Sequence, residues 1–256
     1  MEPDSLVLLD VADGVAVLTL NRPEARNALS PELIVRVQQT CAECDARDDV
    51  SAMVLTGADP AFCGGIDLKR LAAGTSGAIG LIGDGPFPAH RKPIIGAING
   101  AAVTGGLELA LACDFLIASE RARFADTHAR VGVMPGWGLT VALPQAVGLR
   151  RAKQMSFTGN YVDASTALSW GLVNEVVAHD QLIARARQLA IDIASIRSVC
   201  VQEIRSIYDE VADRIGDDAR QFESGRSRTW MTEQFDRTQL ASDREDIIRR
   251  GSSQIS

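Results

Sequence analysis

Short runs that are apolar at almost every position near the N-terminus are typical of β-strands. Leu6–Val11 and Val15–Leu20 are two such runs, and the Asp-Gly pair between them indicates a hairpin. Ser30 and Pro31 then have the residue types of a helix N-cap and a first helical position. We predict an amphipathic helix from this point to about Asp45.

Farther along the chain, short apolar runs alternate with segments of helical periodicity. The predicted strands are Ala52–Thr56, Pro93–Ile98, Phe115–Ala118 and Val173–Val177. The glycine-rich segment Ala72–Pro88 predicts a mobile loop. After Gln181 no strand pattern remains, and the rest of the chain predicts helices. We therefore expect an α/β core at residues 1–195 and a helical region at residues 196–256.

Composition places the chain among soluble globular proteins. It has 256 residues, of which 46% are hydrophobic and 23% charged, so neither disorder nor a coiled coil describes the whole chain. The net charge of −7 argues against a nucleic-acid partner or an anionic membrane surface. No stretch approaches the ~20 apolar residues of a membrane span, and the first residues are acidic, unlike a targeting segment. We expect a cytoplasmic protein with no membrane insertion.

The cysteines carry no sign of a disulfide framework or a metal site. There are five, an odd number at low density, which is typical of a reducing compartment. Cys41 and Cys44 share one face of the predicted first helix, with no second pair and no nearby histidine. Small buried side chains explain them better than zinc ligands do. We therefore expect no metal and no separate cofactor.

Two glycine-rich segments that follow predicted strands are the first candidates for chemistry. They are Thr56–Lys69 and Ile98–Ala110. Glycine between a strand and a helix lets a backbone N–H approach a ligand, and a helix start has free N–H groups. Two such loops can direct two N–H groups at one developing negative oxygen. Tight packing is the alternative explanation of these glycines.

Glu108 is the more specific candidate. It lies in the apolar run Leu107–Cys113, directly after the second glycine-rich segment. A carboxylate there is either a buried, hydrogen-bonded structural group or a reactive group with a raised pKa. The residues alone leave both interpretations open.

Several segments together resemble the enoyl-CoA hydratase/isomerase (crotonase) family, in the family's order and over essentially the whole chain. They are Asn21–Leu29, Ala61–Lys69, Asn99–Asp114, Pro135–Gly136, Phe157–Gly159 and Ala164–Val176. The resemblance implies a crotonase-like spiral of repeated ββα units, followed by C-terminal helices that form trimers, often paired into hexamers. It also implies an acyl-CoA thioester as the partner, with coenzyme A as part of the substrate.

The resemblance assigns roles to the two glycine-rich segments. The backbone N–H groups of Ile66 and Gly105 would form an oxyanion hole for the thioester oxygen as it becomes an enolate. The loop that contains Cys63, Gly64 and Gly65 would lie along the adenine of coenzyme A. Arg26 and Lys69 stand where the family commonly places cationic contacts, although solvated surface side chains explain them as well.

The chain departs from the family pattern at the second catalytic carboxylate. Family hydratases have two glutamates beside the substrate double bond; Glu108 matches one, and His128 stands in place of the other. Gly136 matches the glycine that helps to hold the reacting water. Trp137 replaces a small residue and either lines the acyl pocket or is a core aromatic.

We predict an enoyl-CoA hydratase in which Glu108 activates water. A histidine has an ordinary pKa near 6.5, so His128 can donate or accept the second proton near neutral pH. The alternatives are an isomerase or another CoA-thioester enzyme of this fold, or a non-catalytic acyl-CoA-binding protein. Apolar residues in the C-terminal helices, such as Ile204, Phe222 and Trp230, predict a homotrimer or hexamer.

Overall fold

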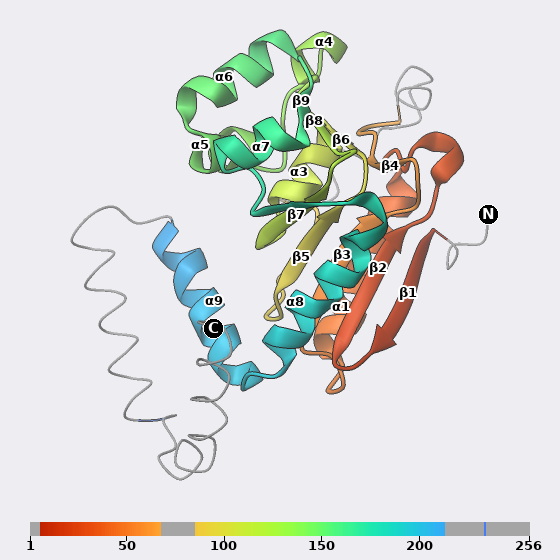
Figure 1. Cartoon of the computed structure of the whole chain (residues 1–256), viewed down its shortest axis with the longest axis vertical. Helices are drawn as coiled ribbons and strands as arrows, with labels where there is room; N and C mark the ends of the chain where they lie inside the picture. Colours follow the sequence, from red (N-terminus) through yellow and green to blue (C-terminus); the bar gives the residue numbers. More distant parts are fainter. Residues whose placement is uncertain (1–5, 68–84, 213–232, 234–256) are drawn as a thin grey trace. The chain divides into compact units, whose positions relative to one another are not determined.

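The computed structural model describes residues 6–67, 85–212 and residue 233 of the chain (Figure 1). The chain divides into two compact units, Met1–Gln202 and Glu203–Ser256. Lys69, most of the predicted mobile loop Ala72–Pro88, and the tail residues Phe222 and Trp230 lie outside the described residues.

The N-terminal hairpin and first helix form as predicted. β1 (Val7–Ala12) pairs antiparallel with β2 (Val15–Leu20). The turn residues Asp13 and Gly14 have φ values of 54° and 77°, a left-handed conformation that an Asp-Gly pair accommodates. Helix α1 (Pro31–Ala46) begins after Ser30, whose side-chain oxygen accepts a hydrogen bond from the backbone N–H of Leu33 at 3.3 Å.

The larger sheet contains the four other predicted strands. Its order is β1-β2-β3-β5-β7-β10, and every pair after the hairpin is parallel. The added strands are β3 (Ala52–Gly57), β5 (Ile94–Ile98), β7 (Phe115–Ser119) and β10 (Glu175–Val177). Parallel strands that are covered on both faces are apolar at nearly every position, so short apolar runs in the sequence predict them.

A second, smaller sheet was not predicted, because its strands have only two or three residues. Its order is β4-β6-β8-β9, with β9 antiparallel to β8. The strands are β4 (Ala61–Cys63), β6 (Ala101–Val103), β8 (Arg123–Ala125) and β9 (Val162–Asp163). The chain passes from β3 to β4, from β5 to β6 and from β7 to β8, so each repeat places one strand in each sheet. The predicted spiral of ββα units is confirmed.

The remaining described elements are helical, as predicted for the second half of the chain. Short helices α3 (Gly105–Leu111) and α4 (His128–Val131) follow β6 and β8. The others are η2 (Pro23–Ala25), α5 (Leu139–Val147), α6 (Leu149–Thr158), α7 (Ala164–Trp170), η4 (His179–Gln181), α8 (Leu182–Ala194) and α9 (Ser198–Ala212). In the described part of the chain, no helix is both long and apolar enough to cross a membrane.

Helices α1 and α8 cover opposite faces of the larger sheet (Figure 1). Leu18 and Leu20 belong to the core cluster that includes the buried face of α1, whereas Val15 and Val17 pack in the cluster that includes α8. This division follows from the two-residue period of a strand. The α1 cluster also holds Cys41 and Cys44, which are fully buried and form no disulfide, in line with their interpretation as small core side chains. Helix α3, which carries Glu108, contributes Leu107 and Leu109 to the same cluster.

Glycines allow the backbone after β4 to pack directly against the start of α3. A Cβ on Gly106 would lie 2.2 Å from the carbonyl oxygen of Cys63, and a Cβ on Gly100 would lie 2.4 Å from that of Pro60. Asn27 holds the chain around the start of β4 in place, because its side-chain amide donates to the carbonyl oxygens of Ala58 and Ala61 at 2.8 and 2.7 Å. The tight-packing explanation of these glycines is therefore correct, and it also brings the two glycine-rich segments together.

Gly106→Ala should lower the free energy of unfolding by about 3 kcal/mol, because a rigid backbone carbonyl occupies the space that the methyl group needs. The better helix propensity of alanine, about 1 kcal/mol, offsets only part of this cost. Urea-induced unfolding measures the difference. Gly85→Ala is the matched control, since the nearest atom to its Cβ would be 4.0 Å away. A Gly106→Ala variant as stable as the wild type would contradict the packing described here.

Candidate active site

Ile66 and Gly105 come from different loops and lie beside each other. Leu29 forms a parallel bridge with Ile66: its N–H donates to the carbonyl of Gly65 at 2.7 Å, and its carbonyl accepts from Asp67 at 3.1 Å. In such a bridge the N–H of Ile66 itself faces away from Leu29. A Cβ on Gly105 would lie 3.8 Å from Cγ1 of Ile66. The structure thus brings together the two residues predicted to form the oxyanion hole.

The residue before Gly105 has an unusual backbone conformation. Thr104 has φ 55° and ψ −115°, which a β-branched residue adopts only when its surroundings impose it. Its N–H donates to the carbonyl of Ala125 at 2.9 Å, and its hydroxyl oxygen lies 2.5 Å from that of Thr127. Ala125 is the last residue of β8 and Thr127 follows that strand, so the end of β8 and the residues after it hold the peptide group that carries the Gly105 N–H. Within the described residues, the N–H groups of Ile66 and Gly105 have no hydrogen-bond partner.

Glu108 lies one helical turn after Gly105 on α3 and is only 5% exposed. Its Oε1 accepts hydrogen bonds from the backbone N–H groups of Gly136 at 3.1 Å and Trp137 at 2.8 Å. Gly136, predicted to hold the reacting water, thus holds the carboxylate in this structure. The two bonds leave Oε2 facing the neighbouring side chain. Glu108 is therefore buried and hydrogen-bonded, in a position where a carboxylate oxygen is directed at a second titratable group.

That second group is His128, the first residue of α4, which is 3% exposed. Its Nε2 lies 3.5 Å from Oε2 of Glu108. On the other side of the ring, Nδ1 lies 2.6 Å from Oδ1 of Asp126. The imidazole is therefore enclosed between two buried carboxylates, of which only Glu108 was predicted.

The two carboxylates change the protonation of His128. Burial alone lowers the pKa of the imidazole, but the hydrogen bonds and negative charges of Asp126 and Glu108 outweigh burial and raise the pKa to about 9. Burial likewise raises the pKa of Asp126, but the hydrogen bonds from His128 and Ser156 more than compensate and lower it overall. At neutral pH, His128 is therefore an imidazolium rather than the half-titrated group expected from its ordinary pKa near 6.5.

The residues predicted to contact coenzyme A lie next to one another where they are described. Arg26 is exposed, and its carbonyl oxygen accepts a hydrogen bond from the N–H of Gly64 at 2.9 Å. Gly65 has φ 89° and packs against Val103, leaving no space for a side chain. The thiol of Cys63 points into the core, where burial raises its pKa to about 12. Cys63 can therefore contribute only backbone atoms to a ligand site.

Trp137 is a core aromatic, as one of the two interpretations of the sequence expected; whether it lines the acyl pocket stays a prediction. Its half-buried side chain packs against the main core cluster, and it also lines a cavity of about 10 Å³. The other lining residues are Leu29, Ile34, Val37, Pro86 and Leu109. Leu29 adjoins Gly105, and Leu109 follows Glu108, so this small apolar cavity lies beside the candidate catalytic groups.

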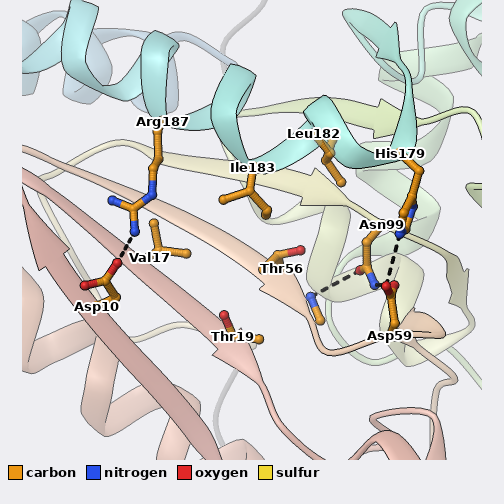
Figure 2. Close-up of a pocket in the computed structure, with 11 residues that line it drawn as sticks. Asp10, Val17, Thr19, Thr56, Asp59, Asn99, His179, Leu182, Ile183 and Arg187 are labelled. Carbon is orange, nitrogen blue, oxygen red and sulfur yellow. Dashed lines mark hydrogen bonds and ion pairs between the residues drawn. The ribbon is translucent and has the colours of Figure 1, made fainter.

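A larger cavity, of about 330 Å³, lies between the larger sheet and α8, on the face of the sheet that α1 does not cover (Figure 2). Val17 and Leu182 line it from β2 and α8, and the ion pair between Arg187 and Asp10 closes one end. None of the residues to which the resemblance assigns a role lines this cavity, although Thr56, Gly57, Asp59 and Asn99 of the two glycine-rich segments do. The described residues contain no group of three His, Cys, Asp or Glu side chains that could hold a metal ion. The candidate active site is therefore the smaller region around Glu108 and His128.

Comparison with known proteins shows the family of this chain. The sequence pattern of the enoyl-CoA hydratase/isomerase family matches residues 10–237. The (E)-benzylidenesuccinyl-CoA hydratase of Thauera aromatica is 43% identical over 202 residues, which are 77% of this chain and 79% of that protein. A probable peroxisomal enoyl-CoA hydratase of Arabidopsis thaliana is 38% identical over 200 residues, which are 77% of this chain and 76% of that protein.

A solved structure agrees at the level of the fold. The crystal structure of an enoyl-CoA hydratase from Mycobacterium tuberculosis H37Rv is 51% identical, with a TM-score of 0.76 over 86% of this chain and 94% of that one. The chain therefore belongs to the enoyl-CoA hydratase/isomerase family, and the crotonase fold predicted from the sequence is confirmed.

His128→Gln should flatten the pH dependence of stability between about pH 6.5 and about pH 9. A histidine whose pKa is raised on folding stabilises the protein fully below its unfolded pKa and loses this effect as the pH rises through its folded pKa. The wild type should therefore lose on the order of 3 kcal/mol more than the variant over this range.

Urea-induced unfolding at both ends of the range measures this difference, whatever the overall stability of the variant. His90→Gln, which changes a histidine outside the site, should behave as the wild type does. Equal pH slopes for the wild type and His128→Gln would show that His128 is not charged in the folded protein.

Proposed function

We propose that this chain is a 2-enoyl-CoA hydratase that adds water across the double bond of an acyl-CoA thioester through an enolate. The observation that carries the proposal is the buried pair Glu108 and His128, 3.5 Å apart, beside the neighbouring N–H groups of Ile66 and Gly105. The relatives named above as hydratases favour this reaction over isomerisation.

In the proposed reaction, the N–H groups of Ile66 and Gly105 donate to the thioester oxygen. In this proposal they stabilise the negative charge that develops on that oxygen when a nucleophile adds to C3, as fixed backbone N–H donors do in an oxyanion hole. The strained conformation of Thr104 keeps the Gly105 peptide group in this orientation before substrate binds.

Glu108 is the base and His128 is the acid. The Glu108 carboxylate takes a proton from water as the water oxygen bonds to C3, and the His128 imidazolium gives a proton to C2 of the enolate. One water is consumed, and the product is a 3-hydroxyacyl thioester. The proton on Oε2 of Glu108 then returns to Nε2 of His128, and the two atoms are close enough for direct transfer. All groups come from the protein and the substrate, so the proposed reaction needs no separate cofactor.

The residues around these groups suit the rest of an acyl-CoA. Arg26 and the backbone at Gly64 adjoin each other and would contact the coenzyme A moiety together with Lys69. Trp137 would form a wall of the acyl site, because it lines the apolar cavity beside Glu108. We also propose a cytoplasmic location, since the described cysteines form no disulfide.

Glu108→Gln should lower turnover by at least ~10²-fold and leave acyl-CoA affinity little changed, because it removes the base but keeps the size of the side chain. The assay is the loss of enoyl absorbance when pure protein is mixed with a panel of 2-enoyl-CoA thioesters. Glu120→Gln, at an exposed glutamate, is the control. Full activity in Glu108→Gln would refute the assignment, and a wild type that binds acyl-CoA without turnover would favour a non-catalytic carrier.

The chain should form a homotrimer or a dimer of trimers in solution. Its first unit exposes large apolar side chains within a short stretch, each at least 43% exposed: Met134, Val141, Leu149, Phe157, Tyr161 and Leu168. Burial against neighbouring subunits would remove this apolar surface from water. Light scattering at micromolar concentration measures the mass, and a monomer would refute the prediction.

A further inference from the structure

Asp126 is a buried carboxylate to which neither the sequence motifs nor the proposed proton transfers assign a role. It lies directly after β8 and is 1% exposed. Its Oδ1 accepts a hydrogen bond from the backbone N–H of His128 at 3.1 Å and lies 2.6 Å from Nδ1 of the same residue. Burying a carboxylate this completely is costly unless its partners are charged or donate hydrogen bonds. Here His128 supplies two of these partners and the hydroxyl of Ser156 a third.

The contact with Asp126 orients the imidazole ring. With Nδ1–H donating to Asp126, the other ring nitrogen, Nε2, is directed at Oε2 of Glu108. The hydrogen bond made by one ring nitrogen of a histidine decides what the other can do. Asp126 thereby leaves Nε2–H as the group that can transfer a proton at the candidate active site.

The contact with Asp126 also balances the positive charge of His128. Two charged groups act on His128 in the described chain: Asp126, from the segment between β8 and α4, and Glu108, from α3. Ser156 on α6 donates a hydrogen bond from its neutral hydroxyl to Asp126. Asp126 and protonated His128 together form a neutral pair. Glu108, whose Oε2 lies 3.5 Å from Nε2, can then act as the base beside a histidine that keeps its proton as the acid.

We propose that Asp126 is a positioning residue that keeps His128 protonated and its Nε2–H directed at Glu108, so that His128 serves as the acid of the site. The catalytic part of this proposal rests on the proposed hydratase function. The protonation part concerns the folded protein alone and can be tested without substrate.

A purely structural role for Asp126 would be to accept the backbone N–H at the start of α4. Asp126→Asn separates the two roles, because the amide oxygen still accepts that hydrogen bond while the negative charge is lost. Asp126→Glu is the complementary variant, since it keeps the charge on a longer side chain. Asp163→Asn is the matched control: it removes an exposed carboxylate at the N-cap of α7, where asparagine caps equally well.

The first measurement is the NMR titration of the histidine Cε1–H signals. The chain has three histidines, so His90 and His179 serve as internal controls, and loss of a signal in His128→Gln assigns His128. We expect His128 to titrate near 9 in the wild type. We expect a midpoint at least one pH unit lower in Asp126→Asn and a high midpoint retained in Asp126→Glu. A wild-type midpoint near 6.5, or an unchanged midpoint in Asp126→Asn, would overturn the proposal, and the wild-type result decides even if a variant fails to fold.

The second measurement is the pH profile of kcat/KM for a short 2-enoyl-CoA. The alkaline limb, where the acid loses its proton, should move to lower pH in Asp126→Asn by the same amount as the NMR midpoint and stay in place in Asp163→Asn. A shifted NMR midpoint with an unmoved alkaline limb would refute the role of Asp126 in catalysis. If the wild type hydrates no thioester on the panel, the proposed function fails, while the histidine titrations still decide whether Asp126 holds the proton on His128.

Discussion

The candidate site depends on the close approach of two backbone segments, the one after β4 and the one that starts α3. Gly106 packs against the carbonyl of Cys63 at a distance that no side chain would allow. Because of this contact, the N–H groups of Ile66 and Gly105 are neighbours, and α3 presents Glu108 one turn farther on. Strand pairing between β4 and β6 continues the same contact into the smaller sheet. The fold and the site therefore share a single steric constraint, that two loops must touch where only glycine fits.

The second organising feature is a buried row of charges, Asp126, His128 and Glu108. A lone buried imidazolium would lose its proton, and two lone buried carboxylates would repel each other. In the row, each charge is the partner of the next, and backbone N–H groups of Gly136 and Trp137 satisfy the outer oxygen of Glu108. The row thus joins three segments of the chain: α3, the start of α4 and the loop before α5.

The contact between Asp126 and His128 explains how a histidine can stand where the family pattern has its second glutamate. A histidine in place of the second glutamate changes the geometry and the charge of the site. Asp126 offsets the positive charge of protonated His128, so the pair is neutral, like a protonated carboxylic acid. The site thereby retains a proton donor beside the Glu108 carboxylate, so the substitution is compatible with the proposed acid–base chemistry.

The sequence by itself determined the class of the fold, the hairpin, the larger sheet and the identity of Glu108 and His128 as candidates. The class of the fold, the hairpin, the larger sheet and Glu108 depend on local periodicity, capping residues and motif spacing, whereas His128 was identified through the resemblance to the family. The sequence did not reveal the smaller sheet, because strands of two or three residues such as β4 have no readable period. Nor did it reveal Asp126, since a carboxylate two residues before a histidine is unremarkable until both are buried. The protonation of His128 was decided by tertiary structure alone, because only the folded chain places Glu108 of α3 and Asp126 on opposite sides of one ring.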